Sequence, residues 1–418
     1  MGTPSWTAVH TSSGPRGNAS RRLPTIHLKP GHVQPVWAGH PWVYAQAVER
    51  VEGGATAGDE VRVVDPRGNL LGRGFYSPKS AIVVRVLARD EKTRFDGRFF
   101  HERIGRADAW RKQCELPSPE TNGFRLVHAE GDDLPGLVVD RFGDAICVQF
   151  TTFGMKLRES LVLQSLLDVV RPTTVIDRTS AGAAKVEGFE AASGVVLGEE
   201  TKELVFLERR LRWAIPLELG QKTGFYFDQR PLRARIEALS KGKRVLDAYS
   251  FVGPFALAAA RGGATEVVAC DENALALEVG ASCARLNGLE GRVSWVREPA
   301  RAVLEGAKGG FDVVLLDPPR LASTRGGREN ALVAYTKIAE LGCRATKPGG
   351  YLALSSCSAA VDMNALTRAL ATGALRANRE AIVVERFFQG PDHPVLAAHG
   401  EGLYLKSLLA RVEPRTGR

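Results

Sequence analysis

The sequence predicts an α/β protein whose larger part is a mostly parallel, doubly wound sheet with one antiparallel strand. From residue 245 onward, short apolar runs alternate with stretches of helical periodicity, the pattern of repeated βαβ units. The first of these runs ends at Asp247 and passes through a single glycine, Gly253, into the apolar helix-like stretch 256–260. The last two runs, 382–388 and 403–412, flank a loop and are expected to form an antiparallel hairpin.

The chain of 418 residues is too long for one compact core, so several domains are expected. The segment 1–22 is rich in Ser, Thr, Gly, Arg and Pro and predicts a disordered tail. Short strands and turns over 23–92 predict a small β-barrel, and 93–204 reads as a small α+β domain. The doubly wound sheet occupies 205–418. Because the chain has no signal-peptide h-region and no bilayer-spanning apolar run, we expect a cytoplasmic protein without a membrane partner.

Charge and cysteine usage indicate which partner, metal content and cellular compartment to expect. The formal net charge of +9 indicates a polyanionic partner, although a basic enzyme without such a partner has the same balance. The 6 cysteines are scattered, without a C-x-x-C pair or a histidine cluster at metal spacing. This pattern argues against disulfides and against a structural zinc, so we expect no metal and a reducing compartment.

In the N-terminal barrel, strands are expected near 61–64, 70–76 and 81–87. The stretch G-H-P-W-V-Y at 39–44 has two interpretations. Its aromatic side chains form a surface platform for a nucleic-acid base, or they fill the interior of the barrel. The second interpretation is the more common one for Trp and Tyr at this spacing.

The central region predicts helices at 98–113 and 157–170 and strands at 145–150 and 174–178. His128, Glu130 and Asp132 flank a tight turn, where local side-chain to backbone bonds are more common than a site. Strands near 203–207 and 211–217 then precede an aromatic stretch, 220–230, which is placed to wall a ligand pocket or to connect two domains. Asp228 in this stretch is expected to cap a helix that begins near Pro231.

Polar residues follow the strands of the predicted sheet where each strand ends. These residues are Asp247, Asp271, Glu298, Asp317 and Cys357. Because the carboxyl ends of parallel strands meet at one edge, they are expected to line a common crevice. Four acids would be costly inside a core, so this edge is interpreted as functional. Asp271, one βαβ unit after Asp247, is placed to accept the hydroxyls of a ribose.

The ligand is expected to carry positive charge. The dinucleotide fingerprint G-x-G-x-x-G is missing after Asp247, and the chain has no G-x-x-x-x-G-K-[ST] motif. An acid at the head of the glycine turn would repel a pyrophosphate but suits a ligand with an ammonium group. S-adenosylmethionine (SAM), with its adenosine, sulfonium and amino acid, fits this description.

The motifs resemble those of a known family. An acid and a single glycine in D-x-x-x-x-x-G, an acid after the second strand and D-P-P after the fourth are similar to class I SAM-dependent methyltransferases with a Rossmann-like fold. More specifically, G-H-P-W-V-Y, L-P-G-L-V-V-D-R at 134–141, Q-K-T-G-F-Y-F-D-Q-R at 221–230, S-C-S at 356–358 and D-H-P at 392–394 resemble the RlmI-like bacterial large-subunit rRNA cytosine-5 methyltransferases. The motifs are collinear from about residue 23 to the end, and the barrel corresponds to that family's PUA RNA-binding domain.

The resemblance implies SAM as cofactor and a set of residues that hold it. This set is Asp247, Tyr249, Ser250, Gly253, Phe255, Asp271, Glu272, Glu298, Asp317, Pro318, Phe225 and Gln229. The chain departs from the family pattern at Val252 and Pro254, where Thr and Gly are usual, and Pro254 lacks a backbone donor. Pro299 stands where an acid often contacts the adenine, and Glu298 is the nearest substitute.

The resemblance also implies a mechanism and a partner. Cys357 is the implied nucleophile, whose thiolate adds to C6 of cytosine so that C5 becomes reactive. Asp317 is expected to hydrogen-bond the N3/N4 edge of the base. The alternatives are an inert core cysteine and an acid that caps the D-P-P turn. The partner is RNA, either large-subunit rRNA or an assembly intermediate, whose base must be flipped out. A homodimer is a possible assembly of the protein that the sequence does not decide.

Two other functions remain open at this stage. One is a methyltransferase acting on a guanine nitrogen, which would need no thiol. The other is a non-catalytic RNA-binding factor of ribosome assembly with a vestigial pocket. Loss of activity in Cys357→Ala distinguishes the first, and calorimetry with SAM distinguishes the second.

Overall fold

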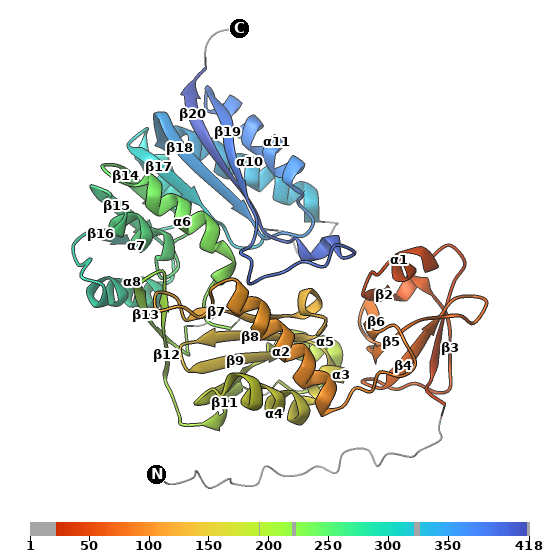
Figure 1. The fold of residues 1–418 in the computed structure, drawn as a ribbon. Coiled ribbons are helices and arrows are strands. Elements are labelled where there is room, and N and C mark those ends of the chain that lie inside the picture. The colour runs from red at the N-terminus through yellow and green to blue at the C-terminus, as the bar shows by residue number, and fades with distance from the viewer. Residues whose placement is uncertain (1–21, 192, 220–222, 322–326, 416–418) are drawn as a thin grey trace, which may run out of the picture.

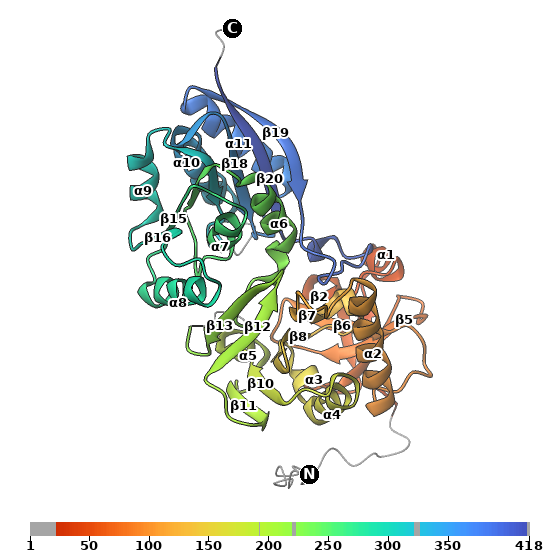
Figure 2. The same cartoon turned by 60° about the vertical axis from the view of Figure 1, so that its left-hand side comes forward.

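The computed structural model describes residues 22–191, 193–219, 223–321 and 327–415. Figures 1 and 2 show three parts in chain order: a small barrel, a central α/β unit and a larger domain built on a seven-stranded sheet. The predicted tail at 1–22 lies outside the described residues except for its last residue, as do residues 220–222 of the aromatic stretch. Within the described ranges, no helix is long and apolar enough to cross a bilayer.

The N-terminal part is a six-stranded sheet that curls around its own core (Figure 1), with strand order β2-β6-β5-β4-β1-β3. Val61, Val63 and Val84 belong to this core and are fully enclosed. Their alternation along the strands follows from the two-residue period of β-structure. The elements are β1 (Thr25–Leu28), α1 (Val33–Trp37), β2 (Trp42–Tyr44), β3 (Val48–Glu52), β4 (Glu60–Val64), β5 (Leu70–Tyr76) and β6 (Ile82–Ala88).

The aromatic side chains of β2 do not fill the barrel, although one of the two interpretations predicted this. Val43 points into the barrel core, so Trp42 and Tyr44 on either side of it point outward. The indole N–H of Trp42 donates to Oε1 of Glu130 in the central unit at 2.7 Å. Its ring packs at 4.2 Å between centroids against His399, near the C-terminus. These residues join the barrel to the rest of the protein.

The central unit is a five-stranded sheet with order β11-β10-β9-β8-β7. The predicted helix at 157–170 is present as one helix that begins at Glu159, and a separate short helix precedes it, whose N-cap residue Thr152 accepts the backbone N–H of Met155. Phe100 and Ile104 of α2 pack on the sheet with Leu166 of α4. The elements are α2 (Gly97–Gln113), β7 (Gly123–His128), β8 (Leu137–Phe142), β9 (Ala145–Phe150), α3 (Phe153–Lys156), α4 (Glu159–Val170), β10 (Thr174–Arg178), α5 (Ala181–Glu187) and β11 (Ser193–Gly198).

A two-stranded ribbon, β12 (Glu203–Glu208) and β13 (Leu211–Pro216), connects the central unit to the large domain. Phe206 and the fully buried Trp213 lie in one continuous core that extends from Phe142 of β8 to the helices of the large domain. Apolar burial therefore continues across this junction, which fixes the central unit against the large sheet.

The large domain has the predicted doubly wound topology, which confirms the fold class. Its sheet has order β16-β15-β14-β17-β18-β20-β19, and β20 runs antiparallel between β18 and β19. One face carries α6 (Arg230–Leu239), α7 (Pro254–Arg261) and α8 (Ala274–Leu286). The other carries α9 (Ala300–Ala307), α10 (Arg328–Ala345) and α11 (Met363–Arg376). The strands are β14 (Arg244–Asp247), β15 (Glu266–Cys270), β16 (Val293–Val296), β17 (Phe311–Leu316), β18 (Thr346–Ser356), β19 (Arg379–Phe387) and β20 (Lys406–Pro414).

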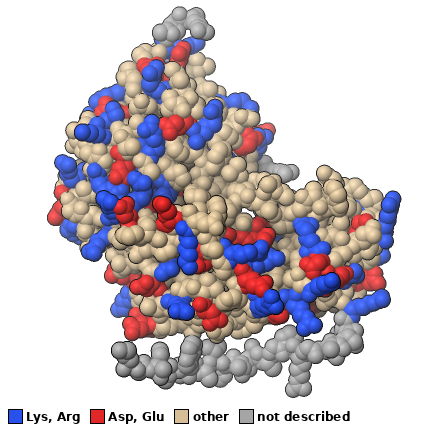
Figure 3. Space-filling view, in the orientation of Figure 1, with Lys and Arg blue, Asp and Glu red and all other residues tan. Residues whose placement is uncertain are grey.

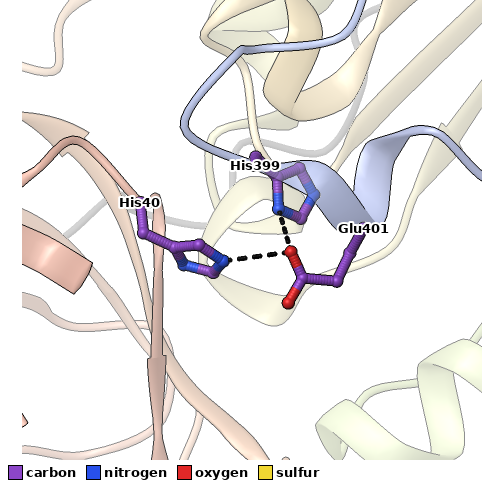
Figure 4. Close-up of side chains that lie close together, drawn as sticks. All are labelled: His40, His399 and Glu401. Atoms are coloured by element: carbon purple, nitrogen blue, oxygen red, sulfur yellow. Dashed lines mark hydrogen bonds and ion pairs between the residues drawn. The ribbon is translucent and has the colours of Figure 1, made fainter.

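The loop at 388–405, between β19 and β20, contacts all three parts of the molecule. Figure 4 shows its contact with the barrel, which we call the barrel latch: His40, His399 and Glu401. Oε2 of Glu401 lies 3.2 Å from Nε2 of His40 and 3.3 Å from Nδ1 of His399. Tyr44 donates its hydroxyl to Oε1 of the same carboxylate at 3.3 Å. The carboxylate of Glu401 is thus hydrogen-bonded to His40 and Tyr44 of the barrel and lies close to His399.

Candidate active site

The carboxyl ends of neighbouring parallel strands bring four predicted site residues to one edge of the large sheet. Asp247 is the last residue of β14, while Asp271, Asp317 and Cys357 directly follow β15, β17 and β18. These four strands are adjacent and parallel. From β14 the chain adds β15 and β16 on one side, whereas β17 and β18 lie on the other side, so the strand order reverses between β14 and β17. Such a reversal is where open α/β sheets bind ligands.

The turn after β14 admits only glycine at position 253. Gly253 has φ +74°, and a Cβ built on it would lie 2.5 Å from the Trp295 ring. Gly253 is the N-cap residue of α7 and Pro254 is one of the first residues of this helix. A proline at this position is compatible with the helix, since the N–H that it lacks has no partner within the helix.

Several backbone N–H groups of this turn already have partners in the protein. The N–H of Phe251 donates to Asp271, that of Gly253 to the carbonyl of Ser250, and that of Ala256 to Asp247. A ligand at this edge must therefore rely more on side chains than on these amides.

Asp247 is a buried acid with a shifted pKa at this edge. Its side chain is fully buried; Oδ2 accepts the N–H of Ala256 at 3.2 Å, and Oδ1 has no hydrogen-bond partner within the described residues. Burial, followed by the nearby charge of Asp317, raises the pKa of Asp247 to about 8. A buried carboxylate with an unused oxygen is expected to pair with a cation.

The predicted ribose-binding acid, Asp271, is half-buried and already oriented. Its Oδ2 accepts the N–H of Phe251 at 2.8 Å and its Oδ1 that of Asn273 at 2.9 Å. Each carboxylate oxygen has more than one acceptor site, so both remain able to accept a ligand hydroxyl. Glu272 and Glu298, by contrast, are exposed, with Glu298 beyond the end of the outermost strand β16.

The aromatic loop before α6 contributes unevenly to this edge. Phe225 and Phe255 are core residues with exposed fractions of 3% and 4%. Gln229 is equally buried, yet neither its amide oxygen nor its amide nitrogen has a partner among the described residues. Such an unsatisfied amide is costly unless a ligand completes it. Among the described residues no side chain caps α6, and Asp228, predicted to do so, accepts the Tyr404 hydroxyl at 2.7 Å.

Tyr226 lies at this edge but was not among the predicted site residues. Its ring meets that of Phe251 edge-on, at 5.6 Å between centroids. Burial, followed by the charges of Asp228, Asp317 and Cys357, raises the pKa of Tyr226 to about 12. The phenol thus lies near both proposed catalytic residues. One indication of this role was present in the sequence, because Tyr226 belongs to the aromatic stretch 220–230 that was predicted to wall a ligand pocket.

The remaining predicted residues support the turn and the D-P-P segment. Ser250 is buried, and its N–H donates to the carbonyl of Cys270 at 2.9 Å. Tyr249 packs against the core on the α10 side of the sheet. Pro318 is buried next to Asp317, which is half-buried.

Cys357 differs from four of the other cysteines in its exposure. All six are free thiols, but only Cys357 and Cys114 are partly exposed. Burial raises the pKa of Cys270 and Cys343 to about 12 and also raises the pKa of Cys147 and Cys283. A thiol that reacts with a substrate must be accessible, so Cys357 is the one cysteine of this edge suited to it.

A buried ionic network links the loop at 388–405 to the central unit and to α6. Asp392 pairs with Arg230 at 3.2 Å and accepts the backbone N–H of Arg125 at 3.1 Å. Its pKa is held well below the usual range, although burial alone would raise it, because Arg230 and His393 favour the charged form. Arg125 in turn forms a two-pronged pair with Asp140. His128 and Asp132, neighbours of this network, are engaged by Arg125 and Arg111 and have structural roles.

Comparison with known proteins identifies the family. Residues 187–411 match the profile of S-adenosylmethionine-dependent methyltransferases, and residues 26–89 match a PUA-like domain. The chain belongs to the SAM-dependent methyltransferases. It is 33% identical over 397 residues to ribosomal RNA large subunit methyltransferase I of Klebsiella pneumoniae, covering 93% of this chain and 98% of the relative. The Shewanella denitrificans protein of the same name is 36% identical over 396 residues, with coverages of 93% and 99%.

The fold is shared with solved methyltransferases. A SAM-dependent methyltransferase structure from Streptococcus mutans has a TM-score of 0.80 at 17% identity, covering 93% of this chain and 99% of that one. A methyltransferase complexed with SAH has a TM-score of 0.81 with the same identity and coverages. In the present chain, the unpaired oxygen of Asp247 and the unsatisfied amide of Gln229 fit a cationic cofactor that also carries hydrogen-bonding groups.

Proposed function

We propose that this methyltransferase forms 5-methylcytosine in large-subunit ribosomal RNA. The observation that carries the proposal is the placement of Cys357, a partly exposed thiol, on the strand next to that of Asp317 and along the same edge as Asp247. The relatives' name supports ribosomal RNA as the substrate, and with it a cytoplasmic site of action. The PUA-like domain and the net charge of +9 are further support, with Lys and Arg side chains spread over the face in Figure 3.

Three groups would hold the cofactor. Asp247 supplies a buried acceptor for positive charge, Asp271 accepts ribose hydroxyls, and Gln229 offers an amide donor and acceptor. When bound, SAM supplies an electrophilic methyl group. Because Asp247 already accepts from Ala256 and Asp271 from Phe251 and Asn273, both acids are oriented before the cofactor arrives.

Cys357 and Asp317 act on the cytosine base. Addition of the Cys357 thiolate to C6 forms a C–S bond and shifts electron density to C5, which then acts as the nucleophile. Asp317 hydrogen-bonds the N3/N4 edge of the cytosine and stabilises the adduct. Loss of the C5 proton after methylation returns the electron pair to the ring and breaks the C–S bond, which releases the thiolate.

A trapping experiment tests this proposal. RNA carrying 5-fluorocytosine has no C5 proton to lose, so the methylated adduct cannot break down. We expect a covalent protein–RNA complex that survives denaturation with the intact protein and Cys114→Ser, but not with Cys357→Ser. On unmodified rRNA from a deletion strain, nucleoside mass mapping should show loss of 5-methylcytosine formation in Cys357→Ala. Methyl transfer retained by Cys357→Ala would refute the covalent mechanism, and methylguanine as the product would favour a guanine-directed enzyme.

A further inference from the structure

A buried lysine beside the proposed nucleophile has no role in the mechanism described so far. Lys406 is the first residue of β20 and is 4% exposed. In the antiparallel pairing of β18 and β20, Lys406 lies opposite Ser356, the residue before Cys357. Its Nζ donates to the carbonyl oxygen of Ser358, the residue after Cys357, at 2.9 Å. Lys406 therefore spans the backbone on both sides of the thiol.

Burial of this amine carries a cost that packing does not explain. Lysine is rarely buried unless it is paired, because its ammonium loses hydration. Its hydrogen bond to Ser358 would be available to a neutral amine or an ammonium alike. A negative group that forms at this place would offset the cost, and a thiolate is such a group.

The charged and titratable surroundings of the pair come from four elements. Asp317 and Arg320 follow β17, and Asp362 precedes α11. Tyr335 of α10 and Tyr226 lie within electrostatic reach of Cys357. Burial lowers the pKa of Lys406 to about 8, while Cys357 and Asp362 raise it and Arg320 lowers it. Lys406 and Cys357 thus interact electrostatically.

We propose that Lys406 is a positioning residue that holds Cys357 as a thiolate through the positive charge of its ammonium group. The inference rests on the proposed function, in which that thiolate attacks C6. No atom is transferred between substrate and Lys406; its charge lowers the free energy of the thiolate before addition and after release. The same charge keeps the thiolate a good leaving group when the C–S bond breaks.

The pH dependence of thiol alkylation tests this inference without using methyl transfer. The intact protein is treated with iodoacetamide between pH 6 and 10, and peptide mass mapping follows Cys357 separately from the other cysteines. In Lys406→Met, which keeps the length but loses the charge, we expect the apparent pKa of Cys357 to rise by about one unit and alkylation at pH 7 to slow roughly tenfold. Lys406→Arg should retain most of the wild-type profile.

Lys347→Met is the matched control, because Lys347 pairs with Asp312 at the opposite end of β18. Its alkylation profile should equal that of the wild type. Circular dichroism and SAM calorimetry verify that each variant is folded, with Lys406→Gln as a second neutral variant if Lys406→Met is not. An unchanged profile in a folded neutral variant overturns the inference.

The test also separates this inference from the proposed function. If Cys357→Ala retains methyl transfer while Lys406→Met still shifts the alkylation profile, the mechanism is wrong and the lysine–thiol pairing stands. If Cys357→Ala is inactive and the profile does not shift, only the role of Lys406 is wrong. With both correct, Lys406→Met lowers kcat and leaves KM for RNA nearly unchanged.

Discussion

Replacing Asp247 by Asn is expected to stabilise the ligand-free protein while it weakens cofactor binding. The carboxyl is fully buried, and its pKa is raised from 3.8 to about 8, first by burial and then by Asp317. A folded-state pKa above the unfolded one means that the folded protein binds more protons, so stability falls as pH rises from about 4 to about 8. Asparagine is neutral and does not carry this cost.

The magnitude follows from the size of the shift. One pKa unit corresponds to about 1.4 kcal/mol, and pH 7 lies roughly three units above the ordinary value for Asp, so the wild-type protein loses up to about 4 kcal/mol there. At pH 5 the same reasoning gives roughly 1.5 kcal/mol. The stability gained by Asp247→Asn should therefore increase with pH. Guanidinium unfolding of both proteins at pH 5, 7 and 8.5, without SAM, measures this difference.

Asp312→Asn is an informative control, because the shift there has the opposite sign. Although burial raises the pKa of Asp312, its hydrogen bonds with the Arg244 backbone and with Lys347 outweigh burial and lower it. That substitution should therefore destabilise the protein at pH 7. An Asp247→Asn variant no more stable than wild type at pH 8.5 would refute our account of Asp247 as an uncompensated buried acid.

Cofactor binding gives an independent measurement on the same residue. If SAM binds the ionised form of Asp247, binding at pH 7 must release a proton, and affinity should rise by up to tenfold per pH unit below about pH 8. Calorimetry in phosphate and in Tris detects the proton through the ionisation heat of the buffer. Buffer-independent heats would show that SAM does not pair with this carboxylate.

Three further outcomes are expected. Gly253→Ala is strained by the positive φ at this position and by contact with Trp295, so its free energy of urea unfolding should fall by roughly 2–4 kcal/mol and most of its SAM affinity should be lost. Wild-type affinity for SAM would contradict the described turn. Asp392→Ala leaves the buried Arg230 without this partner, so the free energy of unfolding should fall by about 3–5 kcal/mol in the same assay, and by more than in Asp392→Asn. A smaller loss would show that the network is dispensable. Glu401→Gln should change unfolding by under ~1 kcal/mol but speed tryptic cleavage at 89–94, beside the barrel; an unchanged rate would mean that the latch does not hold it.

The sequence was most informative where regular geometry alone decides position. Alternating apolar runs predicted the order of strands and helices, and the rule for parallel strand ends placed Asp247, Asp271, Asp317 and Cys357 on one edge. Gly253 was recognisable because a single glycine between a strand and a helix marks a turn.

Long-range contacts could not be predicted in this way. Lys406 reads as one polar residue in an apolar strand, and its proximity to Cys357 depends on the pairing of β20 with a strand that ends 50 residues earlier. Trp42 reads as barrel filling or a base platform, because its partners Glu130 and His399 come from other parts of the chain. Phe225 illustrates the converse limit, since nothing in an aromatic run distinguishes a core residue from a pocket wall.

The loop at 388–405 has a consequence for how the protein is made. It follows the barrel and the central unit in the chain, yet it carries Asp392 for the central unit and His399 and Glu401 for the barrel. The barrel and the central unit each have a core of their own and can fold during translation. Their mutual placement must wait for this loop, as must the arrival of Lys406 beside Cys357. A nascent chain truncated before this loop would thus contain a folded barrel and a folded central unit without the contacts that place them, and it would lack Lys406 beside Cys357.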